Sequence, residues 1–455
     1  MNTLARPEHS VKRFAELRAK LSTAQKFFRQ QVFLNPKFKW YSRTIWAISM
    51  VWALFLAVDS IPYYAAIYAG EVAFKSGDYP EAERQFQIAY SQSQHFYTCD
   101  LRRARACNNL AELYRTEARY SEAEPFYLAA ISMTKTFDSR RAEYPLALSN
   151  LASLYRDEGR YREAEDTSKQ ALAVWDTKVK RGKDLKRAII LEGLGKTYRD
   201  QGRYHEAEKV LTEALMLARQ VLSPDDVQTA PMLVNLGRVY RDQGRLADSE
   251  VAYKRALSLD QVVYGANHPY TVSDKNCLAG LYCDRNLLPQ AEYLYKDVLS
   301  ARTRLFGVQN PLVANSLTGL AEVRLKRGQL RQSHNLVLRA AEIQLAMQGP
   351  SHPELGRSYD VLGQVLTAQG NYADAAIAFQ KAYRIRLASL PANHPDVAYT
   401  LLHIANLKLK CGSIEGARKS ALDAARWMRS SSELSSRKSI LAAATSLVSG
   451  TTSTN

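Results

Sequence analysis

Cysteine is scarce in this sequence, and its placement argues against a disulfide framework or a zinc site. The 455 residues contain five cysteines, which are Cys99, Cys107, Cys277, Cys283 and Cys411. The number is odd, and the spacings of eight and six residues within the two close pairs match no zinc ligand set. We therefore expect the cysteines to be small, buried apolar side chains.

The short motifs that mark common catalytic sites are also lacking. The sequence contains no GxxxxGK[ST] phosphate loop, no GxGxxG, no GxSxG elbow and no HExxH. Neighbouring carboxylates such as Asp225 and Asp226 fall in a loop between helices, where they are turn residues. The sequence therefore predicts that the protein is not an enzyme and needs no cofactor or metal.

Basic residues are in excess, above all near the amino terminus. The formal net charge is +17, and residues 1–43 hold ten Lys and Arg against Glu8 and Glu16. Apolar residues recur at helical spacing among these charges in residues 9–33, which predicts a basic amphipathic helix that lies on a membrane surface. A solvated helix without a partner is an equally good interpretation.

One segment is apolar enough to suggest a membrane crossing. Residues 44–58, TIWAISMVWALFLAV, carry no charge, and Trp40, Tyr41, Tyr63 and Tyr64 flank them as interfacial aromatics would. We predict an uncleaved transmembrane anchor over residues 44–62, because a bilayer needs roughly 20 residues. A buried core helix is the alternative, whereas the long charged leader argues against a cleaved signal peptide. The basic leader predicts a cytoplasmic N-terminus and a remainder on the far side, which is the periplasm in a bacterium.

A short phrase recurs in the rest of the chain and reveals a repeat. YRDEGR occupies residues 155–160, and YRDQGR occupies 198–203 and 240–245. When these copies are aligned, a small residue recurs every 41 to 43 residues, at Ala82, Ala123, Ala164, Ala207, Ser249, Ala291, Ser333, Ala375 and Ala417. Five positions earlier lies a turn residue, which is usually glycine and is Asn286 in one copy. Glycine or asparagine at this point is typical of a helix end with left-handed backbone.

The pattern predicts two antiparallel helices in each of nine repeats. Small residues let the paired helices approach closely, and Leu and Tyr fill the space between repeats. Because no repeat can bury its apolar face alone, stacking must supply the core, and an all-α superhelical solenoid follows. We place this solenoid at residues 63–428. A polar tail follows at 429–455, which we expect to be partly disordered, with a short closing helix at 440–448.

These residues resemble the tetratricopeptide repeat (TPR). The 42-residue length and the loops His268-Pro269, Asn310-Pro311, His352-Pro353 and His394-Pro395 are similar to the repeats of kinesin light chains. The resemblance implies a right-handed superhelix whose first helices line a concave, peptide-binding groove. The kinesin heptad coiled coil has no counterpart here, so a motor-adaptor role is not implied. Each loop histidine belongs to a different repeat, so we expect these side chains to set the loop rather than to share a metal.

Four adjacent repeats carry an arginine at the same position of the first helix, and later repeats do not. Guanidinium groups in register suit carboxylates, and asparagine side chains can pair with an extended peptide backbone. The predicted groove residues are Asn108, Arg115, Asn150, Arg156, Lys196, Arg199, Asn235, Arg238, Arg241 and Asn276. In the alternative interpretation, each arginine pairs with a neighbouring aspartate, namely Asp157, Asp200 or Asp242.

Two classes of function fit these features. The first is a membrane-anchored scaffold that binds short acidic or C-terminal segments of partner proteins. The second is a basic solenoid that binds an anionic polymer or lipid headgroups. Interleaved acidic residues and the few aromatics at groove positions argue against nucleic acid. We expect the later repeats to present a more neutral face, where self-association is possible.

Overall fold

Helices make up the described part of the chain. The computed structural model describes residues 61–74, 78–96, 100–117, 119–138, 141–179, 185–390, 394–428 and 440–446. The chain divides into two units, Met1–Ala65 and Ala66–Asn455, and the fold described below is that of the second. The predicted leader and nearly all of the predicted anchor lie outside the described residues. None of the described helices is both long enough and apolar enough to cross a membrane.

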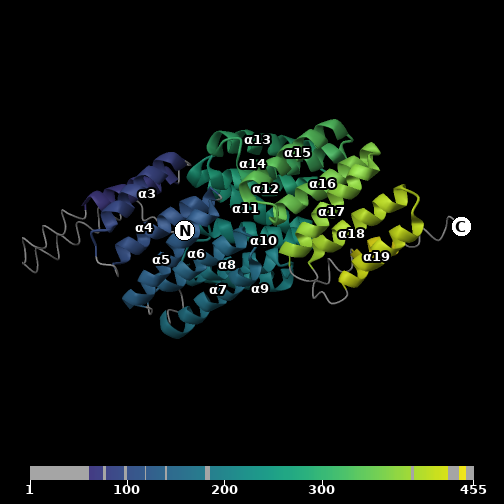
Figure 1. Ribbon diagram of the computed structural model, residues 1–455. Coiled ribbons are helices and arrows are strands. Elements are labelled where there is room, and N and C mark those ends of the chain that lie inside the picture. Colours follow the sequence, from purple (N-terminus) through teal and green to yellow (C-terminus); the bar gives the residue numbers. More distant parts are fainter. Residues whose placement is uncertain are drawn as a thin grey trace, which may run out of the picture. The chain divides into compact units, whose positions relative to one another are not determined.

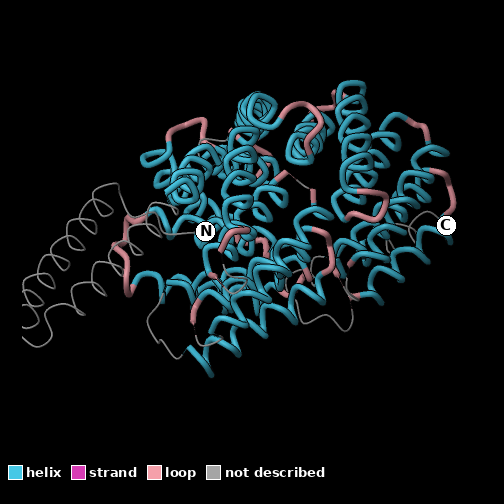
Figure 2. The backbone as a smooth tube through the Cα atoms, turned by 60° about the vertical axis from the view of Figure 1, so that its left-hand side comes forward, coloured by secondary structure: helices cyan, strands magenta, loops and turns pink. Residues whose placement is uncertain are grey.

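Nine helix pairs follow one another in the second unit, as the repeat predicts, and the described residues contain no strand (Figures 1 and 2). Residues 66–74 are helical and pack with α3 (Tyr79–Ser93). The remaining pairs are α4 (Leu101–Thr116) with α5 (Tyr120–Asp138), α6 (Glu143–Asp157) with α7 (Tyr161–Val174), α8 (Leu185–Asp200) with α9 (Tyr204–Arg219), α10 (Ala230–Asp242) with α11 (Leu246–Tyr264), α12 (Pro269–Asp284) with α13 (Leu288–Phe306), α14 (Pro311–Lys326) with α15 (Leu330–Gln348), α16 (Pro353–Gln369) with α17 (Tyr372–Ser389), and α18 (Pro395–Lys410) with α19 (Ile414–Trp427).

The two helices of a pair occupy different layers. Each first helix from α4 to α16 contacts its own second helix and also the first helix of the next pair, and α18 closes this series. Each second helix from α5 to α17 packs against its own first helix and against the first helix of the next pair. We call the side of the first helices that turns away from the second helices the first-helix face.

The small residues of the repeat lie at the closest contacts. All nine members of the series from Ala82 to Ala417 are buried, with at most 1% of each residue exposed. Where serine replaces alanine, its hydroxyl donates to a first-helix carbonyl, at 2.7 Å for Ser249 to Gly237 and for Ser333 to Ala321. A polar side chain is therefore tolerated because its hydrogen bond is made inside the pair.

The predicted turns have left-handed backbone wherever they are described. The turn glycines from Gly159 to Gly412 have φ between 72° and 84°, and Asn286 has φ of 58°. These residues end each first helix and start the second helix in the opposite direction. The prediction of a left-handed turn at this position is confirmed.

The His-Pro and Asn-Pro loops each begin a first helix. The Nδ1 atoms of His268, His352 and His394 accept a hydrogen bond from the backbone N–H two residues later, at 3.1 to 3.2 Å. Asn310 Oδ1 accepts in the same way from Leu312, at 2.8 Å. Each side chain caps its helix, and the following proline has no N–H to leave unpaired.

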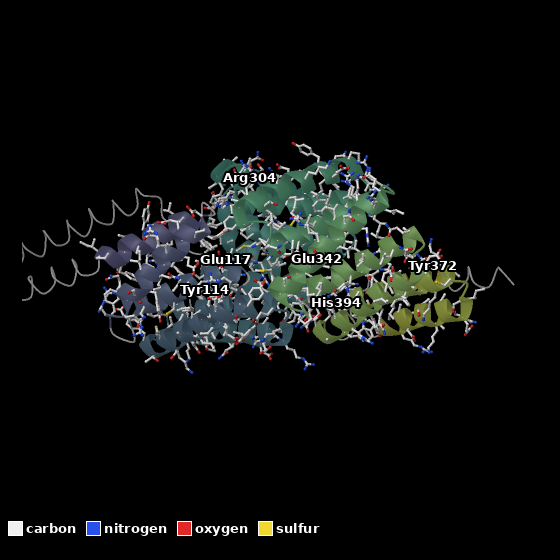
Figure 3. The ribbon with its side chains drawn as sticks, turned by 45° about the horizontal axis from the view of Figure 1, so that its top comes forward. Tyr114, Glu117, Arg304, Glu342, Tyr372 and His394 are labelled. Atoms are coloured by element: carbon white, nitrogen blue, oxygen red, sulfur yellow. The ribbon has the colours of Figure 1, made fainter. Side chains whose placement is uncertain are left out.

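The last arginine of the repeated phrase has a structural role. Arg160 lies over the ring of Tyr155 at 4.0 Å, and Arg203 lies over Tyr198 at 4.1 Å. The same arrangement holds Arg119 over Tyr114, which is labelled in Figure 3 near the end of α4. Each of these arginines also pairs with carboxylates of its own and the preceding repeat, as Arg119 does with Glu83 and Glu122.

The repeat interval of 43 residues, one longer than its successors, coincides with a local change of helix. Between Ala164 and Ala207 the chain forms a π-helix, Trp175–Val179, directly after α7. An added residue within a helix commonly gives such a turn. At the carboxyl end of the array, residues 440–446 are helical, and Ile440 and Ala444 pack with Met428.

Candidate peptide-binding face

All ten predicted groove residues lie on first helices of five consecutive pairs. Asn108 and Arg115 are on α4, Asn150 and Arg156 on α6, Lys196 and Arg199 on α8, three residues on α10, and Asn276 on α12. The four residues Arg115, Arg156, Arg199 and Arg241, which we call the arginine ladder, occupy equivalent positions near the helix ends.

Each ladder arginine contacts an aspartate of the next repeat. Arg115 pairs with Asp157 and also with Glu112 of its own helix. Arg156 pairs with Asp157 and lies 3.8 Å from Asp200.

The ladder continues in the same way through the next two repeats. Arg199 binds Asp242 at 2.7 Å and Asp200 at 3.0 Å. Arg241 pairs with Asp284. These ion pairs run along the helix ends from one repeat to the next. They match the alternative interpretation, in which each arginine pairs with an aspartate. The binding of a ligand by these arginines therefore stays a prediction.

The ion pairs are sheltered rather than fully solvated. Only 13% to 28% of each ladder arginine side chain is exposed. Burial raises the pKa of the Asp157 carboxyl, but Arg156 and Arg115 outweigh this effect and hold the pKa at about 2. An incoming carboxylate would therefore have to compete with a well-held aspartate for a ladder arginine.

The predicted asparagines are also engaged. Asn150 Nδ2 donates to Asn108 Oδ1 at 2.7 Å, which links two repeats. Asn235 donates to Glu192 at 2.9 Å, and Lys196 pairs with the same carboxylate at 2.7 Å. Asn276 Oδ1 accepts from Arg302 at 3.3 Å.

Arg238 on α10 differs from the other basic residues of this set. Its Nε and Nη2 atoms donate to the Cys277 sulfur at 3.3 and 3.2 Å. Unlike the ladder arginines and Lys196, it forms no ion pair with any carboxylate of the described residues. A thiol is a weak acceptor, so this guanidinium retains most of its capacity to bind an anion.

Comparison with known proteins decides the family. The model of the tetratricopeptide repeat matches residues 63–136, 143–220, 228–274, 273–346 and 336–388, which is more than half of the chain. The chain belongs to the tetratricopeptide-repeat family. No curated protein sequence matches it.

Solved structures place other TPR proteins beside this chain. A Rap protein complexed with competence and sporulation factor matches 77% of this chain and 99% of its own, with a TM-score of 0.53 and 12% identity. BtubC from P. vanneervenii covers 51% of this chain and 91% of its own, with a TM-score of 0.37 and 22% identity. A kinesin light chain from Podosopora anserina with nearly identical TPR-like repeats covers 46% and 99%, with a TM-score of 0.36 and 18% identity. The Rap structure supports the fold.

The later TPR repeats differ from the sequence-based expectation of a neutral face. On α16, Arg357 pairs with Glu322 of α14 at 2.9 Å, and Asp360 lies 2.9 Å from His403 of α18. Arg386 of α17 approaches the same Asp360 at 3.5 Å. These charges were missed because they lie at other positions of the repeat than the ladder. The available signal was the pair Asp360 and His403, which are 43 residues apart, or about one repeat.

Two surface hollows lie away from the arginine ladder. The larger, about 640 Å³, is lined mainly by α15 and includes Glu342, which is labelled in Figure 3. The smaller, about 220 Å³, lies among α15, α16 and α17 and includes Tyr359 and Lys381. Among the described residues, no three His, Cys, Asp or Glu side chains gather as a metal site requires.

Proposed function

We propose that this TPR protein is a membrane-anchored scaffold that binds an acidic or C-terminal segment of a partner protein on its first-helix face. The observation that carries this proposal is Arg238, a sheltered guanidinium whose hydrogen bonds go to a thiol instead of a carboxylate. A ligand carboxylate at this point would replace a weak acceptor with a strong, charge-assisted one.

The surroundings of Arg238 favour a ligand that is negatively charged at one point and neutral elsewhere. The ladder arginines on either side, Arg199 and Arg241, already have aspartate partners. A uniformly charged polymer would place further charges beside Asp242 and Asp284, which would repel them. A peptide that presents one carboxylate, or a C-terminus, avoids this repulsion.

The fold supports the use of this surface for binding. TPR arrays present extended surfaces that bind other proteins. The Rap structure, which shares the fold, contains competence and sporulation factor as its bound partner. In this chain, the charge pattern around Arg238 supports the binding of a carboxylate.

Membrane attachment is the second part of the proposal. The uncharged residues 44–58 and the basic leader before them support a single-pass anchor with the N-terminus in the cytoplasm and the solenoid on the far side. A reporter fused after residue 430, which distinguishes the two sides of the membrane, tests the orientation. A cytoplasmic signal from this fusion would overturn it.

The binding experiment uses the full chain with a panel of synthetic decapeptides. The panel pairs free with amidated C-termini and acidic with uncharged sequences, and fluorescence anisotropy reports binding. Arg238→Gln should weaken the binding of the selected peptides by about tenfold or more, because a hydrogen bond to a charged group contributes roughly 1.5–3 kcal/mol.

The matched control removes a complete ion pair from the same face. The double variant Arg241→Gln, Asp284→Asn leaves the net charge unchanged and should bind the peptides as the unmodified protein does. Equal affinity of the Arg238→Gln variant and the unmodified protein would overturn the proposed site. Binding of polyphosphate with steep salt dependence, without selection among the peptides, would favour the anionic-polymer function instead.

A further inference from the structure

Segments that are far apart in the sequence meet where the solenoid winds past itself. His352, in the loop before α16, lies with its Nε2 atom 2.9 Å from the backbone carbonyl of Asp157 at the end of α6. The two residues are 195 positions apart, which is between four and five repeats. Nδ1 of this ring accepts a hydrogen bond from the capping N–H of Glu354. Nε2 therefore carries the ring proton and donates a hydrogen bond to the carbonyl of Asp157.

Two turn glycines show how tightly these segments are packed. A Cβ atom added to Gly159 would lie 3.1 Å from Pro353, and one added to Gly202 would lie 2.7 Å from Pro395. The turn glycine Gly244 has the same backbone conformation but would meet nothing within 4 Å. The close packing at Gly159 and Gly202 therefore comes from the later repeats that lie against these turns, and not from the conformation of the turn itself.

The contact recurs with the repeat. Tyr79, at the start of α3, stacks on Phe306 at the end of α13 with ring centroids 5.4 Å apart. One repeat later, Tyr120 at the start of α5 lies beside the side chain of Gln348 at the end of α15, which acts on the pKa of its hydroxyl. Four successive turns of the early repeats thus meet later repeats.

The same contacts adjoin the arginine ladder. Asp157 accepts the His352 hydrogen bond on its carbonyl, while its carboxylate holds Arg115 and Arg156. Burial lowers the pKa of His394, which caps α18, and Asp396, together with Asp200 and Asp242 that pair with ladder arginines, acts on it in the opposite direction. Figure 3 labels His394 where the later, green helices meet the earlier, teal ones.

We propose that this row of contacts, from Tyr79 with Phe306 to Gly202 with Pro395, is a latch that holds the solenoid closed, and that its release is the movement that opens the first-helix face. Around His352 and the turn glycines, single hydrogen bonds and proline–glycine contacts carry the latch, which suits a reversible one, since each such hydrogen bond contributes only about 0.5–1.5 kcal/mol. The role of this opening in peptide binding rests on the proposed function, whereas the latch contacts themselves are present in the chain without a ligand.

The test compares variants of the full chain in the absence of ligand, by small-angle X-ray scattering and amide hydrogen exchange. In Gly202→Ala the added methyl group meets the rigid ring of Pro395, so the radius of gyration should increase. Gly244→Ala carries the same strain from positive φ, which is 79° against 74°, but has open space and should scatter as the unmodified protein does.

A second variant removes the hydrogen bond without disturbing the helix cap. His352→Asn keeps the cap, because Asn310 caps α14 in the equivalent loop, but it loses the donor to Asp157. Exchange at the amides of residues 158–160 should become about two- to tenfold faster. If Gly202→Ala does not fold, the exchange rates of His352→Asn alone test the latch.

The outcomes separate the latch from the proposed function. Unchanged scattering and exchange in both Gly202→Ala and His352→Asn, relative to Gly244→Ala, would overturn the latch and leave the role of Arg238 untouched. An increase in both supports the latch whether or not any decapeptide binds.

Discussion

Replacement of Asp157 by asparagine should loosen the junction between the repeats of α4 and α6. The carboxylate of Asp157 pairs with Arg115 and Arg156, and its pKa is held at about 2 against an ordinary value of 3.8. Since one pKa unit corresponds to about 1.4 kcal/mol, the ionised form contributes about 2 kcal/mol to stability near neutral pH. The side chain is 22% exposed, so solvent screening is modest.

The pH dependence gives this prediction a second, independent measure. The pKa of Asp157 is lower in the folded chain than in the unfolded chain, so its contribution is complete above the unfolded value of 3.8 and is lost as the pH falls towards 2. The difference between Asp157→Asn and the unmodified protein should therefore shrink from about 2 kcal/mol at pH 7 to about 1 kcal/mol at pH 3.

Amide hydrogen exchange is the appropriate assay, because a repeat array opens in local units. At pH 7 the amides of α6 should exchange on the order of thirtyfold faster in Asp157→Asn. Asp166 on α7, which is exposed and forms no ion pair with the described residues, provides the control as Asp166→Asn. Equal exchange in the two variants would refute the view that the ion pairs between the ladder arginines and their aspartates hold the repeats together.

Two further predictions concern the packing between and within repeats. Burial raises the pKa of Asp260, and burial together with the Asp260 charge raises that of its neighbour Asp274, so this carboxyl pair should cost stability as the pH rises above the ordinary aspartate range. Asp274→Ser should therefore raise the melting temperature more at pH 9 than at pH 5, and an equal gain at both would contradict the assignment. A Cβ atom at Gly363 would lie 2.6 Å from the ring of Phe379, so Gly363→Ala should destabilise by about 1–3 kcal/mol in urea titrations, whereas Gly193→Ala, with ordinary contacts, should stabilise by up to about 1 kcal/mol. Loss of stability in both glycine variants would argue against this view of the close contact.

The helix pairs and their turns could be predicted from the sequence because they depend on local chemistry. A small residue at Ala82 and its equivalents, and glycine or asparagine at the turn, are needed wherever two helices meet closely and reverse. Any stretch that contains them folds into the same unit, so the period alone predicts the nine pairs.

The contacts of the first-helix face could be predicted only in part. The arginine ladder was evident from the alignment of Arg115 with Arg241, but whether each side chain binds a ligand or an aspartate depends on the rotation between successive repeats. This rotation brings Asp157 to Arg115, and it is not encoded in any one repeat. That the hydrogen bonds of Arg238 go to a thiol depends on which side chains of the neighbouring repeat reach it, and the repeat pattern does not contain this information.

The meeting of His352 with Asp157 could not be predicted from the sequence. It depends on the rotation summed over more than four repeats, so a small change in each repeat would move these residues apart. The cap that His352 forms on α16 is enough to explain a histidine in this loop. The sequence therefore gives no sign of its second contact, with the carbonyl of Asp157.

A double-mutant cycle between Arg238 and a peptide carboxylate tests the central claim most directly. The four affinities are those of the unmodified full chain and Arg238→Gln, each for a selected decapeptide with its carboxylate and for the same peptide with that group as an amide. The proposed contact predicts a coupling energy of about 1.5 kcal/mol or more, since the amide and the variant each remove the same charge-assisted hydrogen bond. A coupling energy of zero, with the two changes additive, would contradict the assignment of Arg238 as the carboxylate-binding residue.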